Sequence, residues 1–407
     1  MPPNRLAIFA PHPVQYHAGI YRELAKLEGV DATVFYEDRI GLKPVYVKEF
    51  KTTVQWDIDL LSGYRHVFLR NWSRKPQGGF FARVNPGIVS VLARGRYDAV
   101  LFTGYNRFSE WLIWTFAPWT GARRIFRGEA TLEAGAGVTT LRNRLKKRHL
   151  ARFLSRCDRV LYSCTGNREY FRHYGVPDNK MQLLPCAVDN DYFKNERARH
   201  EPCRLEIRRE LGIAPDDFVI IFAARMLPLK RDDDLINAVS RIDHRRIVLL
   251  FVGDGPARPR AEALAREKGV RAVFTGFANQ GEISRYYAIS DLFAMLSERD
   301  RSPKAMNEAM NFSLPLICTK VTGTAYDLVE DGRNGYMVDT GDLDAIARHI
   351  DHLNRHREEA AAMGRRSLEI VERWSFQADA LSIRDAVRAA VSARPRGCAG
   401  GARKREQ

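Results

Sequence analysis

Short apolar runs alternate with amphipathic stretches along the first half of the chain. Runs short enough for buried strands lie at residues 5–9, 31–36, 99–102, 124–126 and 159–163. Stretches with helical spacing of apolar positions lie at residues 20–27 and 110–116. Strands that alternate with helices at this spacing predict a parallel sheet with crossover helices.

The second half repeats this alternation from its beginning. Its apolar runs lie at residues 218–223, 246–252, 272–275, 292–295 and 316–319. Helical patterns separate them at residues 232–240, 259–268, 281–288 and 303–310. Two such units in tandem predict an α/β protein with two doubly wound, Rossmann-like domains. Ligands of such units bind at the carboxyl ends of the strands, in the cleft between the domains.

Composition indicates where these units end. We expect an N-terminal domain over residues 1–190, a C-terminal domain over 191–371 and a helix over 372–392. The polar segment 189–213 should contain the linker. The tail, residues 393–407, is rich in glycine and arginine, which predicts disorder.

Length, hydropathy and cysteine spacing bound the class of protein. A chain of 407 residues is too long for one typical core, and its hydrophobic content of 45% suits a folded protein. The apolar runs are far shorter than the roughly 20 residues that span a bilayer, and the start lacks the apolar region of a secretory signal. Six cysteines are scattered without a CxxC pair. We therefore expect no disulfide, no metal site and a cytoplasmic location.

Positive charge is concentrated in the first half. Of the net charge of +16, residues 1–193 carry +12, residues 194–392 are neutral and the last 15 residues carry +4. The first half either contacts an anionic partner or is simply well solvated. An anionic partner would be a nucleic acid, a membrane surface or a phosphorylated lipid.

Several common catalytic motifs are missing from the sequence. No GxGxxG sequence follows the first apolar run, and no GxxxxGK[ST], HExxH or GxSxG sequence is present. Their absence argues against an NAD-dependent enzyme, a P-loop NTPase, a zinc protease and a serine hydrolase.

The segment DRSPKAMNE, residues 300–308, has the features of an anion site. Ser302 is a good N-cap and Pro303 suits a first helical turn, so a helix N-terminus with free amides should follow the strand at 292–295. Lys304 beside those amides suits a bound phosphate, and Glu308 could accept two ribose hydroxyls. An ordinary capped helix with solvated charges is the alternative.

Two further loops contribute candidate residues. Arg225 and Lys230 follow the strand at 218–223, and two cations at that place suit a diphosphate. The next strand ends in the turn Gly253-Asp254-Gly255, a weaker signal because glycine and aspartate are common turn residues. A surface loop with solvated cations is the alternative for Arg225 and Lys230.

The second half resembles the donor-binding domain of glycosyltransferase family 4, whose members have the GT-B fold. The similar segments, within residues 185–345, are PCAVDNDYF, RMLPLK, VGDGP, VFTGF, ISRYYAISDLFAML, NEAMNFSLPLICT and DLVEDGRNGYMV. The resemblance implies two Rossmann-like domains that face each other across a cleft, and a C-terminal helix that packs back on the first. It also implies a retaining enzyme that uses a nucleoside-diphosphate sugar and needs no metal or other cofactor.

The family's residue roles are carried over only where the motifs match. Arg225 and Lys230 would bind the donor diphosphate, and Glu308 the ribose. Asp300 would lie near the donor sugar, although the family has glutamate there. The remaining donor-binding residues implied by the resemblance are Gly253, Asp254, Gly255, Phe277, Ser302, Lys304 and Ala305. The sequence 301–303 is Arg-Ser-Pro where the family often has Gly-Phe-Gly, which leaves the donor sugar open.

The first half resembles the family's acceptor domain more loosely. The similar segments are PHPVQYHAGIYREL (11–24), WDIDLLSGY (56–64), FTGYN (102–106) and RGEATL (127–132). They give the acceptor-side candidates His12, Gln15, His17, Gly19 and Tyr105. Glu129 stands near a position where the family often has histidine, and is our further catalytic candidate. A structural role is the alternative for each of them.

A basic stretch, LRNRLKKRHLARFLSR, runs from Leu141 to Arg156 with apolar residues at helical spacing. One interpretation is a core-packed helix with a solvated basic face. The other is contact with anionic lipid headgroups. We expect no nucleic-acid partner, because no recognised module or interleaved aromatic residues accompany the cations.

These features together predict a retaining glycosyltransferase of bacterial surface polysaccharide or glycolipid assembly. Its partners would be a nucleotide-sugar donor and a hydroxyl acceptor, lipid-linked or soluble. The protein would be cytoplasmic or peripheral on the inner face of the membrane. Three alternatives stay open: glycosylation of a soluble small molecule, sugar-nucleotide epimerisation on the same fold, and a catalytically silent sugar-binding or scaffolding protein.

Overall fold

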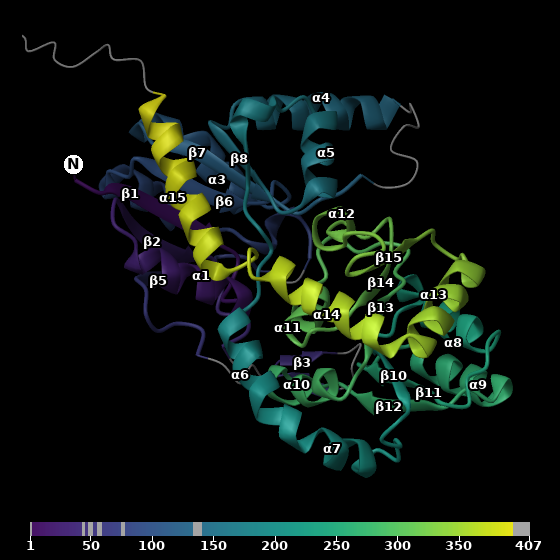
Figure 1. Ribbon diagram of the computed structural model, residues 1–407. Coiled ribbons are helices and arrows are strands. Elements are labelled where there is room, and N and C mark those ends of the chain that lie inside the picture. Colours follow the sequence, from purple (N-terminus) through teal and green to yellow (C-terminus); the bar gives the residue numbers. More distant parts are fainter. Residues whose placement is uncertain are drawn as a thin grey trace, which may run out of the picture.

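Two parallel β-sheets, each covered by helices, organise the chain in the computed structural model (Figure 1). The structure describes residues 2–42, 45–47, 52–54, 59–74, 78–132 and 141–393. The predicted tail at 393–407 and part of the segment 56–64 therefore lie outside the described residues. An antiparallel pair, β3 (Val45–Val47) and β4 (Thr52–Val54), forms a separate small sheet.

The N-terminal sheet has the strand order β5-β2-β1-β6-β7-β8-β9. Its strands are β1 (Asn4–Ala10), β2 (Val30–Tyr36), β5 (His66–Phe68), β6 (Ala99–Thr103), β7 (Arg123–Gly128), β8 (Arg159–Tyr162) and β9 (Met181–Leu183). The helices that accompany them are α1 (Gln15–Lys26), α2 (Gly87–Gly95), α3 (Phe108–Phe116), α4 (Leu141–Ser155) and α5 (Thr165–His173). Each neighbouring pair runs parallel, as the alternation of apolar runs and helices predicts.

The C-terminal sheet has the order β12-β11-β10-β13-β14-β15. Its strands are β10 (Phe218–Ala223), β11 (Ile247–Val252), β12 (Ala272–Gly276), β13 (Leu292–Met295), β14 (Leu316–Thr319) and β15 (Gly335–Val338). Its helices are α8 (Asp232–Val239), α9 (Arg258–Lys268), α10 (Gln280–Ala288), α11 (Lys304–Asn311), α12 (Ala325–Leu328), α13 (Leu343–Arg355) and α14 (Arg357–Val371). All residues of β10, β11, β13 and β14 are buried, which is typical of strands covered on both faces.

The last helix, α15 (Phe376–Ser392), returns to the N-terminal domain and lies beside α1 (Figure 1). Its apolar face, including Ile383 and Val387, belongs to the same buried cluster as residues of β1 and β2. Gly19 of α1 makes the contact close, because a Cβ atom there would lie 2.1 Å from the ring of Phe376. The expectation that the C-terminal helix packs back on the first domain is confirmed.

The polar segment 189–213, which is expected to contain the linker, is largely helical. It forms two helices, α6 (Asn190–His200) and α7 (Arg204–Glu210). Asp189 caps α6 by accepting the backbone N–H of Tyr192 at 3.0 Å. Arg208 is 2% exposed and donates to the carbonyl of Ile289 and to the carboxylate of Asp291. A buried polar residue such as Arg208 is tolerated because it has hydrogen-bond partners, and the polar composition of the segment does not reveal these partners.

The start of α1 also differs, since it begins at Gln15 rather than near residue 20. In its first turn Tyr16 contacts Glu308 of the other domain and His17 contacts Arg127, so these positions do not follow the apolar periodicity of the rest of the helix. Among the helices of the described residues, none combines the length and the apolar character needed to cross a membrane.

Candidate active site

An ion pair joins two loops at the carboxyl edge of the C-terminal sheet. Lys230 ends a short 3-10 turn (Pro228–Lys230) after β10, and Asp300 lies between β13 and α11. The ammonium group of Lys230 donates to the Asp300 carboxylate, and their side chains are 15% and 16% exposed. The backbone N–H of Glu298 donates to the carbonyl of Leu229 at 2.8 Å, so the two loops are also joined through their backbones. Two of the predicted donor residues are therefore held together.

The turn after β11 packs backbone to backbone against the loop after β10. Gly253 has φ +141°, and a Cβ atom there would lie 2.0 Å from the carbonyl oxygen of Ala224. The N–H of Met226 donates to the carbonyl of Asp254 at 2.9 Å. Glycine is required for this approach. Arg225, on the same loop, is thereby fixed at the strand end.

Asp254 and Phe277 are two further donor candidates near this edge of the sheet. The carboxylate of Asp254 accepts the N–H of Gly255 at 2.7 Å and an N–H of Arg258 at 3.3 Å. Phe277 follows β12 and is half-buried. Asp254 thus stabilises its own turn, while Phe277 stands at the edge of the sheet.

Helix α11 begins one residue later than the sequence predicts. Pro303, not Ser302, occupies its N-cap, and no side chain caps the helix. The segment before it is extended, since Pro303 has β-region backbone angles and the carbonyl of Asp300 accepts the N–H of Gly323 at 2.8 Å. Within the described residues the amides of Lys304 and Ala305 have no backbone acceptor. These amides and the positive end of the helix dipole form an anion-binding position.

Glu308, one turn further along α11, is only 6% exposed. Its two carboxylate oxygens accept the hydroxyls of Tyr16 and Tyr287, each at 3.0 Å. Burial raises the pKa of Glu308, although both hydroxyls and the Lys304 ammonium oppose the shift. Tyr16 belongs to α1, so the first domain contacts the residue expected to bind the ribose.

The acceptor-side candidates His17 and Glu129 are joined by Arg127, which sequence reasoning missed. The guanidinium of Arg127 contacts three side chains. It contacts Nε2 of His17 at 2.7 Å, a Glu129 oxygen at 2.9 Å and the sulfur of Cys186 at 3.9 Å. The RGEATL segment contains Arg127, but nothing in the sequence indicates that it is 7% exposed.

The electrostatics of this group are set by burial and by Arg127. Burial lowers the pKa of His17, and the Arg127 cation lowers it further, so His17 is neutral and its Nε2 accepts from the guanidinium. Burial alone would raise the pKa of Glu129, but Arg127 and Lys304 outweigh it and keep the carboxylate ionised. The ammonium group of Lys304 lies 5.7 Å from the centre of the Tyr16 ring on α1, so the first turn of α11 lies close to the first domain.

The remaining acceptor candidates, His12, Gln15, Gly19 and Tyr105, have different surroundings. His12 and Gln15 each have a buried side-chain atom, Nδ1 and Oε1, without a hydrogen bond among the described residues. Burial, and then Arg83, lowers the pKa of His12. Gly19 serves the packing of α1 on α15. Tyr105 lies 3.2 Å from Tyr170 between their hydroxyls.

A cavity of about 420 Å³ brings several of these residues together. His17, Tyr105, Glu129 and Arg127 line it from the N-terminal domain, and Arg301 lines it from the C-terminal domain. His12, Gln15 and Gly19 are not among its lining residues. The structure thus assembles three of the predicted acceptor-side or catalytic residues around one space.

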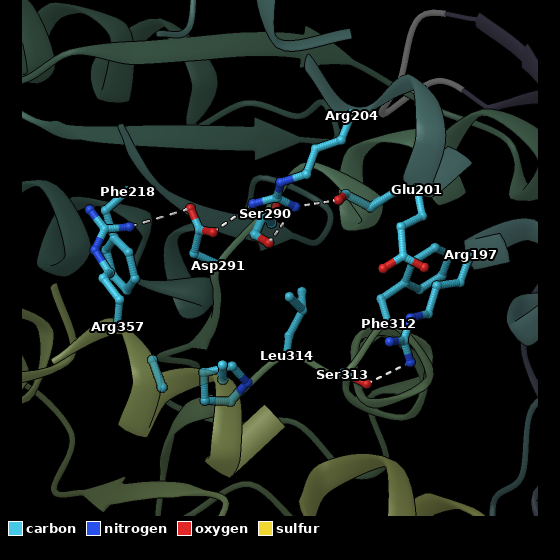
Figure 2. Close-up of a pocket in the computed structure, with 14 residues that line it drawn as sticks. Arg197, Glu201, Arg204, Phe218, Ser290, Asp291, Phe312, Ser313, Leu314 and Arg357 are labelled. Atoms are coloured by element: carbon cyan, nitrogen blue, oxygen red, sulfur yellow. Dashed lines mark hydrogen bonds and ion pairs between the residues drawn. The ribbon is translucent and has the colours of Figure 1, made fainter. Parts of the chain in front are cut away.

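A second cavity, of about 380 Å³, lies at the opposite edge of the C-terminal sheet (Figure 2). Arg204 donates to Asp291 at 2.6 Å, and the guanidinium of Arg357 lies 4.3 Å from the centre of the Phe218 ring. Arg197 donates to Ser313 at 2.6 Å. Its arginines are engaged in structural contacts, and ligands of this kind of domain bind at the carboxyl edge instead.

One group with the spacing of metal ligands occurs in the part of the chain that the structure describes. It consists of His352 on α13, His356 between the two helices and Glu359 on α14. None of the candidate site residues belongs to this group.

Residues 204–369 match the family model described as glycosyl transferases, group 1. This part of the chain is therefore similar to group 1 glycosyltransferases. The match covers the Lys230–Asp300 pair, the first turn of α11 and Glu308. The predicted resemblance to family 4 is therefore confirmed for this half.

Two curated relatives illustrate the range of proteins to which the chain is similar. The sulfoquinovosyl transferase SQD2 of Arabidopsis thaliana is 28% identical over 209 residues, which cover 51% of this chain and 39% of the relative. The GDP-mannose-dependent alpha-(1-6)-phosphatidylinositol monomannoside mannosyltransferase of Mycobacterium tuberculosis is 28% identical over 250 residues, covering 58% and 63%. The chain thus spans less than two thirds of each relative's length.

A solved structure extends the likeness in fold to 95% of the chain. HepE of Anabaena, in complex with UDP, superposes with a TM-score of 0.71 at 17% identity, covering 95% of this chain and all of that one. At this identity the comparison shows the fold. The predicted GT-B architecture is confirmed.

Proposed function

We propose that the protein transfers a sugar from a nucleoside-diphosphate sugar to a hydroxyl group of an acceptor. The observation that carries the proposal is the grouping of Lys230, the free amides of α11 and the buried Glu308 at one edge of a domain similar to group 1 glycosyltransferases. The HepE structure, a complex with UDP on the same fold, supports a nucleoside diphosphate as ligand.

In the proposed reaction the leaving diphosphate gathers negative charge. Arg225, Lys230 and the amides of Lys304 and Ala305 stabilise that charge without a metal ion. Asp300 orients Lys230 and lies beside the donor sugar, and Glu308 accepts the ribose hydroxyls. We propose that the glycosidic bond forms on the face from which the diphosphate departs, so that the anomeric configuration is retained and the phosphate takes the acceptor's proton.

The acceptor side is assigned to the cavity that His17, Tyr105 and Glu129 line. Because Glu129 is ionised and held by Arg127, its proposed role is to orient a hydroxyl by accepting its hydrogen. Closure of the two domains would exclude water, which competes with the acceptor.

The acceptor class is proposed from the names of the relatives. One acts on a phosphatidylinositol mannoside, and another makes N-acetyl-alpha-D-glucosaminyl L-malate. We place this protein in the assembly of a surface polysaccharide or glycolipid, on the cytoplasmic face of a membrane that α4 contacts. A soluble small-molecule acceptor, as in the malate enzyme, is the second candidate.

Replacement of Lys230 by alanine tests the proposed donor site. A thermal-shift screen first identifies the nucleotide sugar, because a ligand that binds only the folded state raises its melting temperature. With that donor, Lys230→Ala should lower turnover, measured as nucleoside diphosphate release, by about 100-fold, the scale of one preorganised charge-stabilising donor. Lys268→Ala, on the far end of α9, is the control and should leave turnover unchanged. Equal turnover in both variants would contradict the diphosphate assignment.

A further inference from the structure

The cavity of about 420 Å³ has a wall that the proposed transfer does not explain. On the side of the N-terminal domain its lining is largely aromatic or aliphatic, from Tyr105, Phe126, Leu150, Leu154, Tyr170 and Phe171. The volume is that of a small-molecule site. A wall of this kind covers the apolar face of a sugar ring or a hydrocarbon group.

Charges around the same cavity do not cancel. Arg127 and Glu129 form an ion pair at 2.9 Å. Glu110 is 5% exposed, and burial, opposed by backbone hydrogen bonds, raises its pKa to about 7, so it supplies only part of a negative charge at neutral pH. Arg301 lines the cavity with an exposed side chain that has no carboxylate partner among the described residues. The excess charge is therefore a cation at the edge of an apolar space.

The backbone of Arg301 is fixed between the two domains. The thiol of Cys164, in the N-terminal domain, lies 3.8 Å from the carbonyl oxygen of Arg301. Gly323 presses against that carbonyl from the other side, where a Cβ atom would lie only 2.1 Å from the oxygen. The backbone N–H of Gly323 also donates to the carbonyl of Asp300. The Arg301 side chain therefore starts from a defined point, which lowers the entropy cost of binding a ligand.

We propose that this cavity binds the acceptor and that Arg301 recognises an anionic group on it, a carboxylate or a phosphate. The guanidinium suits both groups because it can donate two parallel hydrogen bonds to them. The acceptor then carries an anionic group next to a ring or hydrocarbon part that the aromatic wall covers. This assignment rests on the proposed function, since it names the acceptor class of the same site.

Calorimetry with matched probes tests the assignment. The probes are hexyl β-glucuronide, hexyl phosphate and neutral hexyl β-glucoside, titrated into the full chain with and without UDP or GDP. The wild-type protein should bind at least one anionic probe about tenfold more tightly than the glucoside, the effect of one charge-assisted contact. Preference for the glucuronide identifies a sugar acid, and preference for hexyl phosphate identifies a phosphorylated acceptor.

Variants assign that preference to Arg301. Arg301→Gln should bind the anionic and neutral probes equally, while Arg266→Gln, an exposed arginine at the end of α9, should keep the wild-type preference. Equal binding by the wild type, or an unchanged preference in Arg301→Gln, overturns the proposal. A loss of nucleotide binding without a loss of probe preference overturns it as well, because Arg301 would then act on the donor. If the wild type prefers the anionic probes but binds no nucleotide sugar in the thermal-shift screen, the proposed transfer fails, and only the recognition of an anionic ligand by Arg301 stands.

Discussion

Glu308 illustrates how one residue serves two domains. A buried carboxylate is costly unless its charge is compensated by hydrogen bonds, and here two tyrosine hydroxyls compensate it, one from each domain. Each oxygen still has a lone pair to accept a further hydrogen. Ribose hydroxyls can therefore be bound without breaking the contact between Tyr16 and Glu308.

Substitution of Glu308 by glutamine tests the ribose role. Glutamine keeps the size but replaces one acceptor oxygen by a donor NH₂ group, so one of the two expected ribose contacts is lost. Hydrogen bonds to charged groups contribute about 1.5–3 kcal/mol, so the Kd for UDP or GDP, measured by calorimetry, should rise about tenfold or more. Tyr16→Phe, which keeps the carboxylate, is the matched variant and should have the smaller effect. Unchanged nucleotide affinity in Glu308→Gln would remove Glu308 from the site.

Residues close in sequence were easier to predict than residues brought together by the fold. Lys230 could be proposed because it lies in the loop after a buried strand, and Asp300 because it belongs to a segment that resembles the family's motif. The contact between Tyr16 and Glu308 spans 292 positions, and the role of Arg127 depends on burial. No local sequence pattern predicts the Tyr16–Glu308 contact or the burial of Arg127.

At the scale of elements, α4 combines two halves with different surroundings. Leu150, Phe153 and Leu154 are at most 2% exposed and belong to the core of the first domain. Residues 143–149 are all exposed, including Leu145 at 61%. The two interpretations of this basic stretch thus apply to different halves of one helix: core packing to the second, and contact with anionic lipid, which stays a prediction, to the first.

Charge reversal in the exposed half tests the membrane prediction. Changing Arg144, Lys146 and Lys147 to glutamate should strongly reduce co-flotation with anionic liposomes, because each cation near such a surface contributes about 1 kcal/mol. The fold should be unaffected, since these side chains are exposed. Reversal of Arg266, Lys268 and Arg348 changes the net charge equally on the other domain and is the control. Equal flotation of both variants and the wild type would show that the helix is merely solvated.

Strands were predicted more accurately than helices. The apolar runs at 218–223, 292–295 and 316–319 agree with β10, β13 and β14 to the residue, because these strands are buried on both faces. Helices α6 and α7 were not predicted within the polar segment 189–213, because their arginines find partners far away in sequence. The period of apolar residues predicts an element only where packing, rather than ion pairing, buries it.

At the scale of the whole molecule, a buried charged group connects both domains with the returning helix. Asp379 on α15 is fully buried, and no side chain among the described residues donates a hydrogen bond to its carboxylate. Arg127 of the first domain and Lys304 of the second both act on it electrostatically, as does Glu129. The donor side, the acceptor side and α15 thus share one group of charges.

This group should make stability depend on pH through Asp379. Burial raises its pKa to about 8, although Arg127 and Lys304 oppose the shift, whereas an unfolded aspartate titrates near pH 4. Between these values the folded protein keeps a proton that the unfolded chain has lost, so the stabilising effect of protonation, complete below about pH 4, is lost as the pH rises through 8. Asp379→Asn cannot lose that proton. Its melting temperature relative to the wild type should therefore increase from pH 5 to pH 8 and then level off. Asp385→Asn, exposed on the same helix, is the control and should run parallel to the wild type. If the melting temperatures of Asp379→Asn and the wild type instead differ by the same amount at every pH, Arg127 and Lys304 keep the buried carboxylate ionised throughout this range.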